Sequence, residues 1–448
     1  SDGIHNTLRE FGIKSYNFTG IYLEMFSTHL TVFRWFPVRH SIRCCFRILT
    51  GLVMVVLVSL IMEAFFHPPM IKRAHILIQG FDNPIFKNKI LQKLFSGTFA
   101  GRTPPAEIEQ VHLGFVKVHK AASSTTQNIF LRFGYLRNLT FVLPPEKNAF
   151  SWPNIISLNE SITTYNIVPP PPGRHFEIVC HHVIYGREAF RKFLPNDTAI
   201  IGTVREPFSL FESMLRYMEP SYIMRIIGDR KVSKFLRNTF LYEPESPSKS
   251  MTNNRMAFEY GCPSDIIIRR DISAFKDYLR VLDKDFAVVL LAERFDESLV
   301  LMKRYLHWTL KDILYAKLNV GKGKRDTKDK DTFPLTVDPD DEPWYRNHSI
   351  LDYYLYDFFK NRLERQIDAE GPDFADETEH FDKVRKEAEH FCHTSMKDSD
   401  SIRIKQSPWN EEFDVTIFDC ELMHKYEITF TTMIRERQYN MKSTWSYK

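Results

Sequence analysis

The chain has 448 residues, of which 43% are hydrophobic and 26% are charged. These proportions predict a globular protein of one large or two ordinary domains and exclude a disordered or collagen-like chain. A formal net charge of +4 is too small to indicate a general nucleic-acid-binding protein. Only 17 residues are glycine, and neither G-x-G-x-x-G nor G-x-x-x-x-G-K-[ST] occurs, so the two commonest glycine-rich nucleotide sites are excluded.

The most apolar stretch is residues 48–66, whose one charged residue, Glu63, lies near its end. A helix of about 19 residues just spans a thin hydrocarbon layer. Four arginines precede the stretch, at Arg34, Arg39, Arg43 and Arg47, whereas two basic residues follow it. The positive-inside rule therefore predicts a cytosolic tail at 1–47, a type II membrane anchor at 48–66 and a luminal stem at 67–110. The alternative, a buried core helix, is less favoured because the stretch has no polar face.

Sequons and cysteines follow the expected anchor. Each N-x-[ST] sequon there is a candidate glycosylation site if this part of the chain is luminal. The sequon asparagines are Asn138, Asn159, Asn196 and Asn347. Cysteines on the same side could form one or two disulfides, and their pairing is left open. They are Cys180, Cys262, Cys392 and Cys420. No C-x-x-C or H-x-x-x-H pair indicates a metal site.

From residue 111 onward, β-like runs alternate with helical patterns. The β-like runs are 113–118, 176–180, 199–204 and 287–291, and the helical patterns are 123–133, 207–217, 296–305, 309–317 and 350–370. This alternation predicts an α/β domain at 111–371 with a mainly parallel central sheet flanked by helices. Residues 372–448 become acidic and then mixed, and we treat them as a C-terminal extension of uncertain structure.

The first candidate motif is the turn between the first strand and the first helix of this domain, at 117–125. The free N–H groups and the dipole at a helix start form an anion site. Lys120 adds a positive charge, and hydroxyls follow it at Ser123, Ser124 and Thr125. The alternative is a hydroxyl cluster that caps the helix beside ordinary surface lysines.

Two further candidate motifs also end strands. Arg205 closes one β run, where open α/β sheets bind ligands, and Ser213 lies in the helix that follows. An arginine fork suits a phosphate group, although a surface ion pair between Arg205 and Glu206 is the alternative. His181 and His182 close another β run, and a histidine there can act as a general base near neutral pH.

Together, these motifs resemble those of the galactose 3-O-sulfotransferase family. The segment 117–125 matches K-x-H-K-T-A-S-S-T, with Ala121 in place of the family's threonine. The segment 205–213 matches R-D-P followed by F-E-S, with Glu206 in place of aspartate. The segment 180–183 matches C-N-H-M, with His181 and Val183 in place of asparagine and methionine. Further matches lie at 290–299, 308–319 and 351–356, so the resemblance covers roughly 111–371.

The resemblance implies a P-loop-like sulfotransferase fold, a Golgi type II membrane enzyme, and 3′-phosphoadenosine 5′-phosphosulfate (PAPS) as sulfate donor. It implies sulfation of the 3-hydroxyl of galactose in a glycolipid or glycoprotein glycan, without a metal or nucleic acid; homodimerisation is left open. The residues implied to bind the 5′-phosphosulfate are Lys120, Ala121, Ala122, Ser123, Ser124 and Thr125. Arg205 and Ser213 are implied to bind the 3′-phosphate. His182 is the implied base, and Lys120 the residue that neutralises the leaving group.

Three alternatives stay open. One is an enzyme like the uronyl 2-O-sulfotransferases, which act on glycosaminoglycans. A second is a Golgi glycosyltransferase, because D-x-D strings of the kind that bind its metal occur at 329–331 and 338–340; we interpret both as solvated charge. The third is a pseudoenzyme that binds galactosides without sulfating them.

Overall fold

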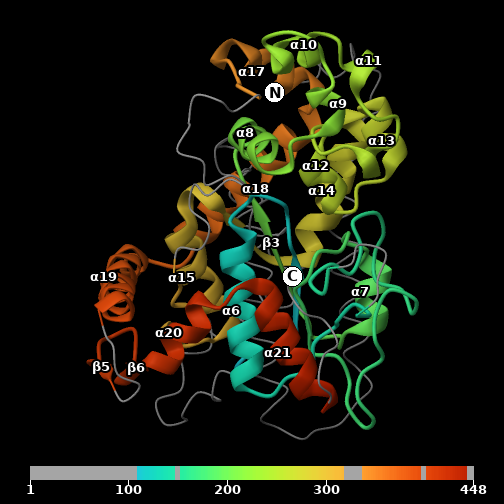
Figure 1. The fold of residues 1–448 in the computed structure, drawn as a ribbon. Coiled ribbons are helices and arrows are strands. Elements are labelled where there is room, and N and C mark those ends of the chain that lie inside the picture. Colours follow the sequence, from blue (N-terminus) through green and yellow to red (C-terminus); the bar gives the residue numbers. More distant parts are fainter. Residues whose placement is uncertain (1–107, 147–151, 317–334, 395–399, 441–448) are drawn as a thin grey trace, which may run out of the picture. The chain divides into compact units, whose positions relative to one another are not determined.

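The computed structural model describes residues 108–146, 152–316, 335–394 and 400–440 (Figure 1). Every described residue belongs to one compact unit of the chain. The expected anchor at 48–66 lies outside the described residues. Among the described helices, none combines the length and the hydrophobicity that a membrane span requires.

Four parallel strands form the central sheet. They are β1 (Leu113–Val116), β2 (Ile178–Val179), β3 (Ala199–Val204) and β4 (Phe286–Leu291), in the spatial order β2-β1-β3-β4. Leu113 pairs with Ile178 on one side and with Ala199 on the other. All residues of the four strands are buried, as expected for a parallel sheet that is covered by helices. The predicted α/β class is confirmed.

The structure contains the helices predicted at 123–133, 207–217, 296–305 and 350–370, together with further helices that the sequence analysis did not predict. The first part of the chain forms α6 (Ser123–Leu136), α7 (Arg187–Phe193), α8 (Pro207–Met218), α9 (Ser221–Met224), α10 (Lys231–Arg237), α11 (Thr239–Tyr242), α12 (Arg255–Glu259), α13 (Ser264–Arg269) and α14 (Ile272–Asp285). The later part forms α15 (Phe295–Leu306), α16 (Leu310–Ile313), α17 (Glu342–His348), α18 (Ile350–Asp368) and α19 (Asp373–Thr394). Helices α14, α15 and α18 pack on β4.

The expected helix at 309–317 is wrong beyond its first turn. Thr309 and Asp312 form a capping box that fixes the start of α16. The helix ends at Ile313, because Leu314 takes an extended backbone with ψ 145°. A capping signal therefore predicts where this helix begins, whereas nothing in the sequence marked its early end.

The residues beyond 371 add structure that the sequence left uncertain. After α19 come the antiparallel pair β5 (Ser401–Ile404) and β6 (Phe413–Thr416), and then α20 (Ile417–His424) and α21 (Glu427–Tyr439). Helices α20 and α21 lie beside α6 (Figure 1). A disulfide joins Cys392 of α19 to Cys420 of α20, whereas Cys180 and Cys262 are buried free thiols. One of the expected disulfides thus exists in the described part of the chain.

A close approach between β3 and the end of α12 prepares the site. A Cβ atom on Gly202 would lie 2.3 Å from the hydroxyl oxygen of Tyr260, so glycine is required there. That hydroxyl donates a hydrogen bond to the carbonyl of Thr203 at 3.1 Å. Because Tyr260 directly follows α12, this contact holds the last residue of α12, Glu259, beside the ends of the strands.

Candidate active site

The three candidate motifs meet at one edge of the sheet. Lys117 and His119 follow β1, His182 follows β2, and Arg205 follows β3. The carboxyl ends of parallel strands lie at the same edge, where α/β proteins bind ligands. The structure therefore brings together segments that are 85 residues apart in the sequence.

The turn between β1 and α6 adopts left-handed backbone without glycine. Lys120 has φ 59° and Ala122 has φ 57°. Ala122 is also the N-cap residue of α6, no side chain in the described part of the chain caps this helix, and its first turn holds no acidic residue. The N–H groups at the start of α6 therefore lack a side-chain acceptor and suit an anion.

The hydroxyls of this turn have different surroundings. Ser123 donates its hydroxyl to the carbonyl of Val118, so this hydroxyl closes the turn, and the backbone N–H is what Ser123 can offer an anion. Thr125 is buried and Ser124 is half-buried. Ala121 is completely buried in the core, which explains why a small apolar residue is accepted there.

Lys120 and Arg205 form a pair of neighbouring cations. The Arg205 guanidinium donates to the carbonyl of Lys120 at 3.1 Å. The Lys120 ammonium lies 4.2 Å from the centroid of the Tyr217 ring. Burial and the charge of Arg205 lower the pKa of Lys120. Two cations that repel each other are stabilised by a bound anion, so this pair marks an anion site.

Acidic side chains build the Arg205 turn. The Glu206 carboxylate caps α8 by accepting from the N–H groups of Phe208 and Ser209 at 3.0 and 2.7 Å. Glu293, in turn, accepts from the N–H group of Glu206 at 2.8 Å. The alternative of a surface Arg205–Glu206 ion pair is therefore wrong, because Glu206 serves the helix.

Ser213 lies in α8, the helix that also carries Tyr217, whose ring contacts Lys120. It precedes Tyr217 by four residues, so the two side chains share one face of α8. No described hydrogen bond joins Ser213 to Arg205 or Lys120. The structure thus puts Ser213 on the side of α8 that faces the cation pair.

The two adjacent histidines have different environments. His181 is completely buried, and its Nε2 atom lies 3.0 Å from the hydroxyl of Thr431 in α21. Burial, with the charges of Lys117 and Arg435, lowers the pKa of His181 to about 3. His181 is therefore a core residue, which leaves His182 as the histidine of this pair that a substrate can reach.

His182 is half-buried and neutral. Its ring stacks on the His119 ring with 4.0 Å between centroids and 21° between planes. Burial, followed by the charges of Lys117 and His119, holds the pKa of His182 well below its usual value. A neutral imidazole can accept a proton, as a general base must.

A buried His–Glu pair lies behind His182, and the sequence analysis missed it. One carboxylate oxygen of Glu259 accepts a hydrogen bond from the backbone N–H group of His119 at 2.9 Å, and the other contacts Nδ1 of the His119 ring. Arg255 donates to the same carboxylate at 2.8 Å. Although burial raises the pKa of Glu259, the charges of His119 and Arg255 lower it to about 2. Glu259 is therefore a permanent anion that orients the His119 ring.

A second buried pair ties the C-terminal extension to the site. Lys117, which is 2% exposed, forms an ion pair with Glu427 at the start of α21. The side chain of Asn154 donates to the same carboxylate. No local pattern links Lys117 to a residue 310 positions away, so the sequence alone gave no signal for this contact.

The other residues that the sequence analysis singled out do not take part in this site. The four sequon asparagines are all exposed, and their glycosylation stays a prediction. Asp338 and Asp340 are exposed, and Asp338 caps a short 3₁₀ helix by accepting from the N–H group of Asp340. The D-x-D motif at 338–340 therefore has a structural role. The D-x-D motif at 329–331 lies outside the described residues.

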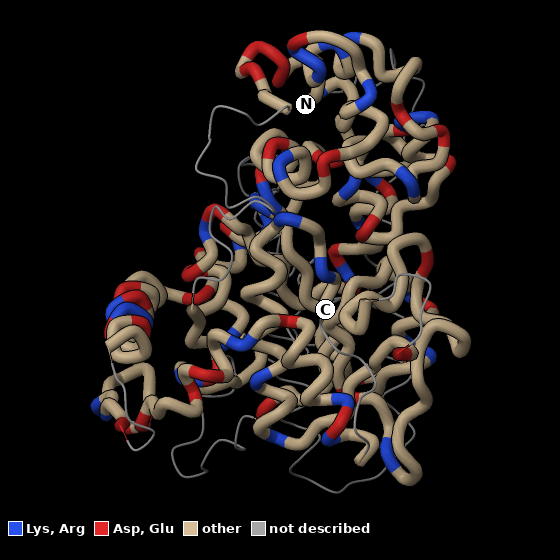
Figure 2. Tube along the Cα trace, viewed as in Figure 1, with Lys and Arg blue, Asp and Glu red and all other residues tan. Residues whose placement is uncertain are grey.

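Charge is mixed over most of the molecule. Basic and acidic residues alternate along the trace, and in α19 they follow each other closely (Figure 2). An affinity for anions must therefore come from local groups, as it does at Lys120 and Arg205.

Comparisons with known proteins agree with this site. The family model described as Galactose-3-O-sulfotransferase matches residues 70–439. Galactose-3-O-sulfotransferase 3 of Mus musculus is 28% identical over 332 residues, which cover 72% of this chain and 73% of that protein. Galactosylceramide sulfotransferase of Homo sapiens is 30% identical over 262 residues, which cover 57% of this chain and 58% of that protein. No solved structure matches the chain. Because the family model spans most of its length, the chain belongs to the galactose-3-O-sulfotransferase family of carbohydrate sulfotransferases.

Proposed function

We propose that this enzyme transfers the sulfuryl group of PAPS to the 3-hydroxyl of a galactose residue in a glycolipid or glycoprotein glycan. The observation that carries the proposal is the cation pair of Lys120 and Arg205 at the start of α6, together with the neutral imidazole of His182, which stacks on His119, the residue before Lys120. The names of the relatives, which refer to galactose and galactosylceramide, support the acceptor class.

The donor set fits a ligand with two anionic groups. The residues proposed to hold the 5′-phosphosulfate are Lys120, Ala121, Ala122, Ser123, Ser124 and Thr125, chiefly through backbone N–H groups at the start of α6. Arg205 and Ser213 are proposed to hold the 3′-phosphate. When bound, PAPS supplies an activated sulfuryl group on a good leaving group.

The chemistry we propose needs one base and one cation. His182 takes the proton of the sugar 3-hydroxyl while the oxygen of that hydroxyl forms a bond to sulfur. At the same time, the bond between sulfur and the phosphate oxygen breaks. Lys120 stabilises the negative charge that develops on that phosphate oxygen. Glu259 acts on this step through His119, because its carboxylate orients the ring on which the His182 ring stacks.

The alternatives are less supported. The D-x-D string at 338–340 is used as a helix cap, which removes the described feature that favoured a glycosyltransferase. An enzyme acting on uronyl residues would share the PAPS site and differ in its acceptor. We also propose that the enzyme lies in the Golgi membrane, as the family resemblance implies, with its catalytic part luminal, as the apolar stretch at 48–66 and the arginines before it predict.

The proposal predicts a large catalytic loss for Lys120→Ala. Removing a charge that stabilises the transition state costs about 3–4 kcal/mol, so kcat should fall about 10²–10³-fold in a PAPS-dependent assay. Lys276→Ala is a matched control, because Lys276 also lies over a tyrosine ring, that of Tyr354, but on α14. Wild-type turnover in Lys120→Ala would overturn the role of Lys120.

The two histidines should respond differently to substitution. His182→Ala should lower kcat about 10²–10⁴-fold, because it removes the base, without weakening the binding of adenosine 3′,5′-bisphosphate. His181→Asn should keep most of the turnover, because the ring contributes a hydrogen bond to Thr431 in the core. Single-turnover kinetics with saturating PAPS measure both effects. The opposite ranking of the two variants would show that the base is assigned to the wrong histidine.

An acceptor panel tests the proposed specificity. Purified protein is incubated with labelled PAPS and with lactosylceramide, other β-galactosides or heparan fragments, with and without EDTA. We expect label on the galactose 3-hydroxyl and the same rate in EDTA. Label on heparan fragments alone would establish the uronyl alternative, and binding without transfer would establish a pseudoenzyme.

A further inference from the structure

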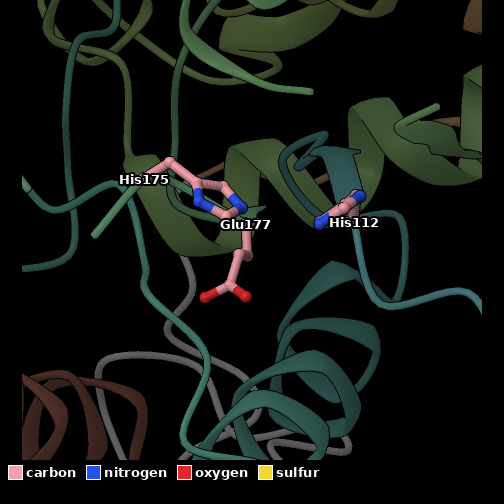
Figure 3. Close-up of side chains that lie close together, drawn as sticks. All are labelled: His112, His175 and Glu177. Carbon is pink, nitrogen blue, oxygen red and sulfur yellow. The ribbon is translucent and has the colours of Figure 1, made fainter. Parts of the chain in front are cut away.

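We infer that a divalent transition-metal ion, for which zinc is the best fit, binds at the amino-terminal edge of the sheet through His112, His175 and Glu177 (Figure 3). This edge is opposite to the one that carries Lys120 and Arg205. The inference does not rest on the proposed function, because it concerns the stability of the fold.

The parallel sheet brings the three side chains together. His112 immediately precedes β1, and Glu177 immediately precedes β2, with His175 two residues before it. The Leu113 N–H group donates to the Glu177 carbonyl at 2.8 Å, so the two strand starts are hydrogen-bonded. Figure 3 shows His175 and Glu177 on one segment and His112 across from them.

The donor atoms are close enough to share an ion after small rotations. One ligand atom from each residue lies within 4.8 Å of the other two. Ligands of a tetrahedral zinc ion, each about 2.1 Å from the metal, are about 3.4 Å apart. His175 is exposed, and His112 and Glu177 are half-buried, so their side chains have room to close this difference.

A carboxylate from a third strand start orients one of the rings. Nδ1 of His112 lies 2.8 Å from a carboxylate oxygen of Asp197, shortly before β3. A carboxylate on one ring nitrogen fixes the orientation and tautomer of a metal-binding histidine and leaves the other nitrogen as the ligand. Nε2 of His112 is therefore the nitrogen left for a metal.

One carboxylate oxygen of Glu177 is left to bind the metal. Its Oε2 atom accepts from the Thr140 N–H group at 2.7 Å and lies 3.4 Å from the Arg174 guanidinium. The other oxygen, Oε1, is the one that we assign to the metal. Two imidazoles and one carboxylate, with water in the fourth position, form a ligand set that zinc accepts. Such an ion would clamp β1 to β2 far from the sulfuryl transfer.

The test is zinc binding by the metal-stripped full chain without a histidine tag. Calorimetry with zinc chloride should give one ion per chain for the wild type, and the ion should raise the melting temperature. His175→Ala should weaken zinc binding at least about tenfold, and Asp197→Asn about 10–100-fold. His390→Ala, which removes an exposed histidine of α19, is the matched control and should bind as the wild type does.

Both outcomes of this experiment are decisive. His175 is exposed, so its variant should fold, and a melting temperature equal to that of the metal-free wild type shows that it does. Equal zinc affinity in the wild type and in His175→Ala would overturn the inference. So would a wild-type melting temperature that zinc does not change.

Discussion

The structure depends on keeping two cations next to each other at the start of α6, which no side chain among the described residues caps. Lys120 and Arg205 are joined by one hydrogen bond, and the backbone beneath them is left-handed at Lys120 and at Ala122. Each non-glycine residue in this conformation costs roughly 1–2 kcal/mol. A fold tolerates such a cost at a functional site, and an anion at the start of α6 would compensate for the repulsion between the cations.

The surrounding residues hold this arrangement from several directions. Glu206 and Glu293 fix the turn that carries Arg205. Glu259 anchors His119, the residue before Lys120, and Glu427 pairs with buried Lys117. Removing one partner of a buried ion pair typically costs about 3–5 kcal/mol, so α12 and α21 are parts of the site although they lie far from it in the sequence.

The sequence predicted what local patterns encode. Buried apolar runs marked the four strands, and the hydroxyl-rich turn after Lys120 marked an anion site. It could not predict His119–Glu259 or Lys117–Glu427, because partners 140 and 310 residues apart leave no periodic signal. Scarce glycine excluded the glycine-rich nucleotide sites, and these supply the commonest phosphate-binding turns. The structure shows instead that a lysine and an alanine adopt the backbone for which glycine is the usual choice.

The most direct test of the central claim is an equilibrium measurement that involves no catalysis. Adenosine 3′,5′-bisphosphate is titrated calorimetrically into the wild type, Arg205→Ala and Arg216→Ala, the last being an exposed arginine of α8 that serves as the control. Loss of a charge-assisted hydrogen bond costs about 1.5–3 kcal/mol, so Arg205→Ala should bind at least about tenfold more weakly while Arg216→Ala binds normally. Unchanged affinity in Arg205→Ala would contradict the account.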